Sequence, residues 1–129
     1  MTDYYLSDIA EETGKLFEYW ANNNMDMDKM VTNYMKSHFR ANVDKRYAKF
    51  CTQMWYDMAE HFDGIEGKDQ YDFVLCNWLG QFYTYLQEYT GKSSDAIISE
   101  YPFNIMYPRS NTLHDLDMKL AVKKVGGSR

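Results

Sequence analysis

The sequence predicts an all-α protein, a single-domain helical bundle of about five to seven helices around a central helix at residues 71–90. Three observations indicate this class. Apolar residues recur at helical spacing along most of the chain, no segment shows the two-residue alternation of a strand, and hydrophobic residues make up 45% of the 129 residues, enough for one core. We expect residues 1–125 to form the domain and residues 126–129 to be a flexible tail.

The central helix is predicted from the breadth of its apolar face. Its apolar side chains spread over more than half of a helical wheel and leave only a narrow small or polar stripe. An exposed amphipathic helix has a narrower apolar face, so other helices are expected to surround this one. We expect Trp78, Phe82 and Leu86 to be almost fully buried. Gly91 is expected to end the helix in the left-handed conformation.

The first half of the chain predicts two or three further helices. A first helix is expected over about residues 3–21, where apolar residues share one face, and three asparagines end it. Residues 27–62 carry two more apolar stripes and form either one long helix or two. The stripes fall out of phase near residues 40–42, which favours a break there. Asp26 or Asp28 is expected to cap the start of this region.

The last third of the chain predicts two short helices separated by an irregular segment. Ser93 or Ser94 is expected to cap the first of them. An apolar segment follows, YPFNIMYPRSN, which contains Pro102 and Pro108. Because proline disrupts a helix interior, we expect a turn of 3₁₀ helix or a packed loop here. Asp117 is expected to cap the final helix.

The net charge of −5 is concentrated in the first half of the chain. Residues 1–70 contain 13 acidic and 8 basic residues, whereas residues 71–129 contain 6 of each. A general nucleic-acid binder needs a basic surface, so this balance argues against direct nucleic-acid binding.

Cysteine usage and hydropathy predict a cytoplasmic protein. Cys51 and Cys76 are isolated from each other in the sequence and lie on apolar helix faces, which is typical of reduced core cysteines. The chain begins with no signal-peptide pattern, and no apolar run reaches the length of a membrane span. We therefore expect no membrane insertion.

The histidines suggest one catalytic alternative. His114 is followed by Asp115 and Asp117, a pattern similar to the His-Asp pair of helical metal phosphohydrolases, and it would imply a small metal-dependent enzyme using these residues. Such enzymes need a further carboxylate far downstream, and only a dozen residues follow Asp117. Asp117 as a helix cap and His114 as a loop residue is the favoured interpretation. We predict no catalytic residue, no metal ligand and no cofactor.

Two groups of residues are candidates for binding another protein. The first helix carries Glu11, Glu12 and Glu18 on the side opposite its apolar face, where they are available to steer a basic partner. The alternative is internal pairing of this acidic helix with a basic cluster, which comprises Lys36, Arg40, Lys45, Arg46 and Lys49.

The second group lies on the narrow polar stripe of the central helix. Asn77, Gln81 and Thr84 follow one another at helical spacing, and Gly80 between them allows another backbone to approach closely. Buried amides need hydrogen-bond partners. The stripe is therefore a docking groove for a partner segment, an internal hydrogen-bond network or a solvated surface.

Several short motifs occur in an order similar to that of a known group of proteins. They are Trp78-Leu79-Gly80, Tyr85-Leu86-Gln87, Thr90-Gly91-Lys92-Ser93, Met106-Tyr107 and Leu113-His114-Asp115. Over about residues 27–125 the chain thus resembles small helical proteins of Firmicutes, some encoded beside toxin-like genes on mobile elements. The resemblance implies a bacterial accessory protein such as an antitoxin and carries over no catalytic residues.

These observations predict a non-catalytic protein-binding module, antitoxin-like or inhibitor-like, whose partner is another protein. One alternative is a phage-type inhibitor of a host defence nuclease, similar to anti-CRISPR proteins, that uses an acidic face to mimic nucleic acid. The other is the small enzyme that uses His114. A homodimer is compatible with the sequence.

Overall fold

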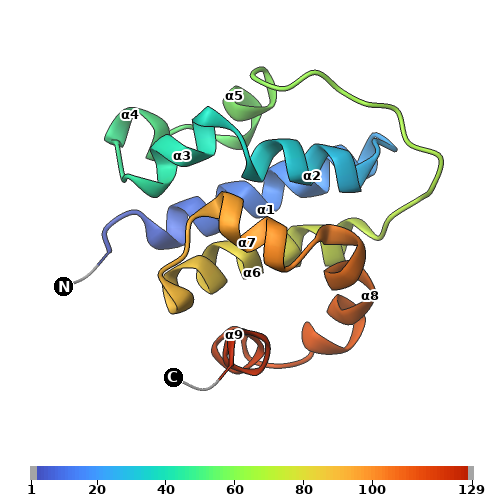
Figure 1. Ribbon diagram of the computed structural model, residues 1–129. Helices are drawn as coiled ribbons and strands as arrows, with labels where there is room; N and C mark the ends of the chain where they lie inside the picture. The colour runs from blue at the N-terminus through green and yellow to red at the C-terminus, as the bar shows by residue number, and fades with distance from the viewer. Residues whose placement is uncertain (1–2, 128–129) are drawn as a thin grey trace.

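The computed structural model describes residues 3–127 and confirms the all-α class (Figure 1). Within this range there are nine helices, two more than the upper end of the expected number. They are α1 (Leu6–Asn22), α2 (Met27–Met35), α3 (His38–Asp44), α4 (Ala48–Cys51), α5 (Trp55–Ala59), α6 (Phe73–Thr90), α7 (Ser94–Glu100), α8 (Phe103–Leu113) and α9 (Met118–Gly126). Residues 3–127 contain no strand, and the one isolated β-bridge joins Met25 to Glu66.

Helix α6 is the central helix, as the sequence predicts. It packs most extensively against α1 and also contacts α7, α8 and α9 (Figure 1). It begins after Asp72, whose carboxylate accepts hydrogen bonds from the backbone N–H groups of Val74 (2.8 Å) and Leu75 (3.3 Å). It ends at Gly91, which has a φ of 72°, so the predicted left-handed glycine is confirmed.

Two glycines set the distance between α1 and α6. A Cβ atom on Gly80 would lie 2.7 Å from the Gly14 Cα and from the Thr13 carbonyl oxygen. A Cβ atom on Gly14 would lie 2.8 Å from the Asn77 carbonyl oxygen. Real Cβ atoms do not come this close to backbone atoms, so the two helices approach each other only because both residues are glycine.

Gly80→Ala is therefore expected to lower the free energy of unfolding by about 1–3 kcal/mol, because overpacking forces the two backbones apart. This loss would appear despite the helix propensity of alanine, which favours the substitution by about 1 kcal/mol. Urea denaturation measures the change. Gly64→Ala is the matched control, because its Cβ would meet only the flexible end of Met25, at 3.1 Å. Equal stability of the two variants would contradict the close helix contact.

The core of the molecule draws buried residues from α1, α2 and α6 and also from α7, α8 and α9. Phe82 and Leu86 are 0% exposed, as predicted. Trp78 differs from the prediction, because it is only half-buried. Its ring stacks on Phe82 at a centroid distance of 4.9 Å and an interplanar angle of 17°, which places it at the margin of the core.

Residues 27–62 form four helices, so the predicted single break near residues 40–42 is wrong. Those residues lie inside α3, and the breaks fall on either side of it. Ser37 caps α3 by accepting a hydrogen bond from the Arg40 N–H at 3.0 Å. Arg46 follows α3 with a φ of 61°, a left-handed conformation that cannot continue a helix.

Asp26, one of the two expected caps, caps α2 by accepting a hydrogen bond from the Lys29 backbone N–H at 3.2 Å.

The segment predicted as a 3₁₀ turn or loop is instead the helix α8. Pro102 stands immediately before its first residue, where a missing N–H costs nothing. Pro108 lies inside the helix but is exposed, so the carbonyl group four residues earlier can bond to water. The buried residues of α8 recur at helical spacing: Phe103, Met106, Ser110 and Leu113.

The C-terminal part of the chain packs against α6. Ser93, one of the two expected caps, caps α7 through the Ala96 N–H at 3.2 Å. Asp117 precedes α9 as expected, but its side chain makes no capping hydrogen bond. Gly126 is the last residue of α9, one residue beyond the predicted end of the domain. The Tyr89 hydroxyl donates to the carbonyl oxygen of residue 127 at 2.6 Å. Residues 128 and 129 of the predicted tail lie outside the described residues.

Candidate protein-binding surface

One member of the predicted basic cluster, Arg40, is buried at the centre of the molecule with 1% of its surface exposed. Its guanidinium donates from Nη1 to Thr13 Oγ1 and to the Tyr34 hydroxyl, each at 2.9 Å. It donates from Nη2 to Thr84 Oγ1 at 3.1 Å and to Gln87 Oε1 at 2.8 Å. Arg40 thereby connects α3 to α1, α2 and α6, and it is not available to a partner.

Asp44 supplies the negative charge beside Arg40. Its Oδ1 lies 3.5 Å from the Arg40 Nε and also accepts a hydrogen bond from Gln87 Nε2 at 2.9 Å. Its Oδ2 accepts from the Ser94 N–H at 2.8 Å. The carboxylate therefore offsets the buried charge and attaches the start of α7 to this network, which gives these residues a structural role.

Arg46 and Lys36, two other members of the basic cluster, form ion pairs within the protein. Arg46 Nη2 lies 2.7 Å from Asp3 Oδ2, before α1 begins, and this hydrogen-bonded guanidinium lowers the pKa of the Asp3 carboxyl group. Lys36 Nζ lies 2.6 Å from Asp95 Oδ1 in α7. Asp3 falls within residues 3–21, the range predicted for the acidic first helix, so the internal pairing that the sequence left open is found for Arg46, whereas Lys36 pairs with a carboxylate of α7.

The polar stripe of α6 forms hydrogen bonds within the protein. Thr84 is buried and bonds to Arg40. Asn77 Nδ2 donates to Glu18 Oε1 at 2.9 Å, and Gln81 Nε2 donates to Asn77 Oδ1 at 2.7 Å. Helix α1 occupies the space beside Gly80, so the close backbone approach expected at this glycine occurs within the chain. Partner binding by Asn77, Gln81 and Thr84 stays a prediction.

The three glutamates predicted to bind a partner differ in their surroundings. Glu11 is exposed, and its closest basic group is Lys15 Nζ at 3.8 Å. Glu18 is half-buried beside Asn77. Glu12 is only 7% exposed, and its Oε1 accepts a hydrogen bond from the backbone N–H of Trp55 at 2.9 Å. The expectation that all three lie on a free face is therefore wrong for Glu12, which holds the first residue of α5.

Aromatic side chains gather where Glu12 attaches α5 to α1. The rings of Tyr19 and Trp55 lie 5.1 Å apart at an interplanar angle of 39°. The Tyr56 ring meets the edge of Trp55 at 5.5 Å and 79°, and Tyr56 is 52% exposed. A cleft of about 320 Å³ lies among Tyr19, Trp55, Tyr56, Ala59 and Glu60.

The surroundings of this cleft are acidic. The segment 54–66 contains four carboxylates and no lysine or arginine. Asp57 is exposed on α5, Glu60 is exposed directly after this helix, and Glu11 is exposed on α1 with Lys15 Nζ at 3.8 Å. We name this region the acidic aromatic surface, and it consists of Glu11, Tyr19, Trp55, Tyr56, Asp57, Ala59 and Glu60. Sequence reasoning identified Glu11 and missed the aromatic part.

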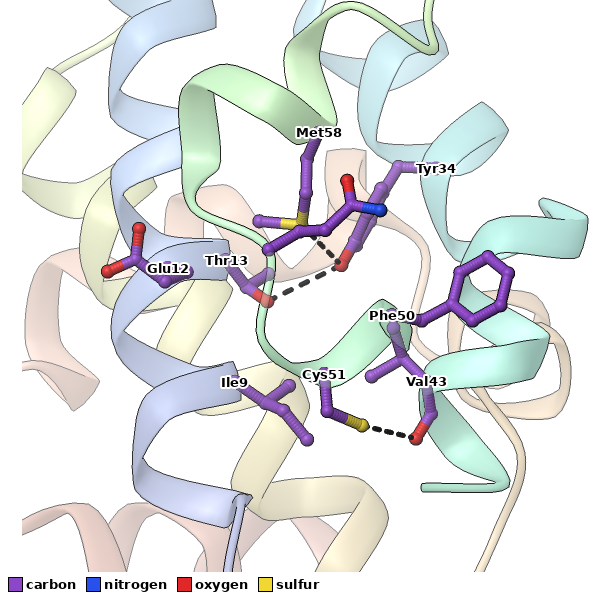
Figure 2. Close-up of a pocket in the computed structure, with 9 residues that line it drawn as sticks. Ile9, Glu12, Thr13, Tyr34, Val43, Phe50, Cys51 and Met58 are labelled. Carbon is purple, nitrogen blue, oxygen red and sulfur yellow. Dashed lines mark hydrogen bonds between the residues drawn. The ribbon is translucent and has the colours of Figure 1, made fainter. Parts of the chain in front are cut away.

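A second, enclosed pocket lies between α1 and the segment that links α3 to α5 (Figure 2). Its volume is about 10 Å³, which is room for about one water molecule. The Tyr34 hydroxyl faces Met58 Sδ at 3.9 Å, and Cys51 Sγ faces the Val43 carbonyl oxygen at 3.6 Å. The pocket is too small for a substrate.

A larger cleft, about 530 Å³, lies between α6 and α9. Its lining carries two carboxylates, those of Glu88 and Asp117, and one lysine, Lys119. The lining residues are Gln81, Tyr85, Glu88, Tyr89, Asp117, Met118, Lys119 and Val122. Gln81 is the one predicted partner-binding residue among them.

The histidine motif has a structural explanation. His114 Nδ1 bonds to the Ser110 carbonyl oxygen at 2.9 Å at the end of α8, and its Nε2 lies 3.5 Å from Asp115 Oδ1. Within residues 3–127 no three His, Cys, Asp or Glu side chains gather as metal ligands would.

Both cysteines are buried free thiols. Burial raises the pKa of Cys76 to about 12 and also raises the pKa of Cys51. They are therefore protonated at neutral pH and are poor nucleophiles, since the thiolate is the reactive form.

Comparisons with protein-family models, with curated proteins and with solved structures each found no match. The resemblance to Firmicutes mobile-element proteins therefore stays a prediction. Among the described residues, none of the helices combines the length and the apolar character that crossing a membrane requires.

Proposed function

We propose that this chain is a non-catalytic protein-binding module whose acidic aromatic surface binds a basic segment of another protein. The observation that carries the proposal is the exposed ring of Tyr56 in a segment, residues 54–66, that contains four carboxylates and no lysine or arginine. Tyr56 leaves half of its surface in solvent beside Asp57 and Glu60. Tyrosine and tryptophan are enriched at protein interfaces because they combine a large apolar area with a polar end.

The charge of the surface defines the partner. Exposed carboxylates on α1 and α5 attract a positively charged surface over about 8–10 Å at physiological ionic strength. Such charges mainly raise the association rate, and the aromatic side chains supply contact area once the complex has formed. An antitoxin or an inhibitor that must capture its target rapidly benefits from this combination.

A phage-type inhibitor of a nuclease is the second candidate, and it uses the same surface. A nuclease binds nucleic acid through a basic surface, which the carboxylates of α1 and α5 complement. The two candidates differ in what the partner's contact site normally binds. A DNA duplex that competes with this chain for its partner favours the nuclease inhibitor, whereas unaffected binding favours the antitoxin-like function.

The test is a double charge reversal, Glu11→Lys with Glu60→Lys. Glu12 stays unchanged because it holds Trp55. Immobilised wild-type chain captures partners from an extract of the source cells, and each captured protein is then purified for kinetic measurement. We expect the double variant to associate with its partner about tenfold more slowly and with a weaker dependence on salt. Its thermal unfolding should match the wild type, because exposed substitutions cost about 0.5 kcal/mol or less.

The matched control reverses two exposed carboxylates elsewhere, Asp69→Lys with Asp115→Lys. Asp69 lies in the loop between α5 and α6 that Figure 1 shows, Asp115 lies in the turn before α9, and neither lines the cleft. The control variant carries the same net charge as the test variant, so a general charge effect would slow both equally. Equal association rates for the two variants would contradict a partner site on the acidic aromatic surface.

A further inference from the structure

We propose that the cleft of the acidic aromatic surface receives an arginine side chain of the partner. The inference rests on the proposed function and adds the chemical group that the surface recognises. Its elements are two aromatic walls and one carboxylate at the rim, supplied by Trp55, Tyr56 and Glu60.

The ring geometry suits a planar cation. Trp55 and Tyr56 stand almost perpendicular, at 79°, so a guanidinium stacked on one ring presents its edge to the other. Tyr19 lies 5.1 Å from Trp55 on α1 and supports the indole from a separate helix. Tryptophan is the strongest cation–π partner among the aromatic residues, and arginine is the cation that most often takes this position. Its planar group also stacks on aromatic faces, which an ammonium group does not.

A backbone hydrogen bond holds the start of α5, which carries Trp55 and Tyr56, in place before any ligand binds. The Trp55 N–H donates to the buried carboxylate of Glu12, so the start of α5 is attached to α1 at this point. A site on an anchored helix loses less conformational freedom on binding than a loop would. Glu12 is therefore a positioning residue for the cleft.

The carboxylate at the rim supplies the charge. Glu60 lines the cleft, and within residues 3–127 it forms no ion pair. Asp57 is exposed one helical turn before it. A guanidinium can donate two parallel hydrogen bonds to one carboxylate, which adds both energy and directional specificity. A phosphate group would be repelled here, and an apolar side chain would cover Glu60 without compensating its charge.

The volume of the cleft also fits one side chain. At about 320 Å³ it is at the lower end of the range of small-ligand pockets, and it is open to solvent at one side. The cleft therefore has room for the side chain of a single arginine on an extended peptide, while the flanking backbone lies across the exposed Tyr56.

The test uses defined peptides and does not require the partner. Acetyl-Gly-Arg-Gly-amide is titrated into the protein while the indole N–H signals are followed by NMR. We expect a saturable shift of the Trp55 signal and little change for Trp78, which lies on α6 and serves as an internal reference. The citrulline peptide has the same shape without the charge, and it should bind at least about tenfold more weakly.

Three variants complete the test, two of them at tyrosines with the same exposed fraction. Tyr56→Leu removes one wall and should abolish the saturable shift. Tyr47→Leu is the control, because Tyr47 is also 52% exposed but lies before α4. Glu60→Gln should lower the affinity for the arginine peptide and leave the affinity for the citrulline peptide unchanged. Equal binding of the arginine and citrulline peptides, tighter binding of a lysine peptide, or full binding by the Tyr56→Leu protein would overturn the proposal.

The result is separable from the proposed function. If the partner complex depends on Glu11 and Glu60 but the arginine peptide produces no saturable shift, the protein contact stands and the arginine site fails. If the peptide binds as expected but charge reversal leaves the association rate of every captured partner unchanged, the arginine site is supported and the proposed function is wrong.

Discussion

Arg40→Met is expected to lower the free energy of unfolding by about 3–5 kcal/mol. Methionine fills much of the same volume but leaves the hydroxyls of Thr13, Tyr34 and Thr84 without their donor. It also leaves Asp44 as an uncompensated charge at a mostly buried position. Each buried polar group that loses its partner costs about 1–3 kcal/mol, so the total exceeds that of an ordinary side-chain truncation.

Arg46→Met is the matched control for this variant. It is the same chemical change in the next arginine of the sequence, but the Arg46 side chain is 32% exposed and pairs with Asp3 near the surface. We expect a loss of about 1 kcal/mol or less, since water replaces the lost contact. Urea denaturation of both variants gives the comparison. A loss for Arg40→Met no greater than for Arg46→Met would show that the network contributes little to stability.

The sequence could not show that Arg40 is buried. It stands among other basic residues, and arginine is almost never fully buried unless it is paired. The hydrogen-bonding needs of the α6 stripe could be predicted from Thr84 on an otherwise apolar helix. The partner that meets this need comes from a residue 44 positions away, which no local pattern specifies.

Long periodic segments were predictable, and short ones were not. Helices α1 and α6 have 17 and 18 residues, long enough for the apolar period to be unmistakable. Helix α5 has only five residues, too few to be told apart from the longer apolar stripe that contains it. Helix α8 was missed because Pro108 breaks the local rule, although its exposed position removes most of the cost.

The candidate site was predictable only in its charge. The acidic excess of the first half is visible in the sequence, and Glu11 is exposed as expected. The aromatic half depends on where α5 begins, and that is set by the hydrogen bond from Trp55 to Glu12 across 43 residues. Glu12 looked like a surface acid because its neighbours in the sequence are polar. Tertiary structure, and not the local sequence pattern, decides which glutamate forms a hydrogen bond within the protein and which stays exposed.

Phe82→Ala is also expected to lower the free energy of unfolding by about 3–5 kcal/mol, through lost burial and the cavity that remains. The ring is 0% exposed and stacks on Trp78, with Tyr83 at 6.1 Å. It lies on α6, against which four other helices pack, so the cavity would open where several elements meet and where none can move in alone to fill it.

Phe73→Ala provides the control within the same helix. Phe73 is the first residue of α6 and is 47% exposed, so the same truncation removes far less buried area and leaves no enclosed cavity. We expect a loss of about 1 kcal/mol or less. Urea denaturation of the two variants isolates burial as the cause, because the residue type and the helix are unchanged. If Phe82→Ala were as stable as Phe73→Ala, α6 would not be the helix around which the core is built.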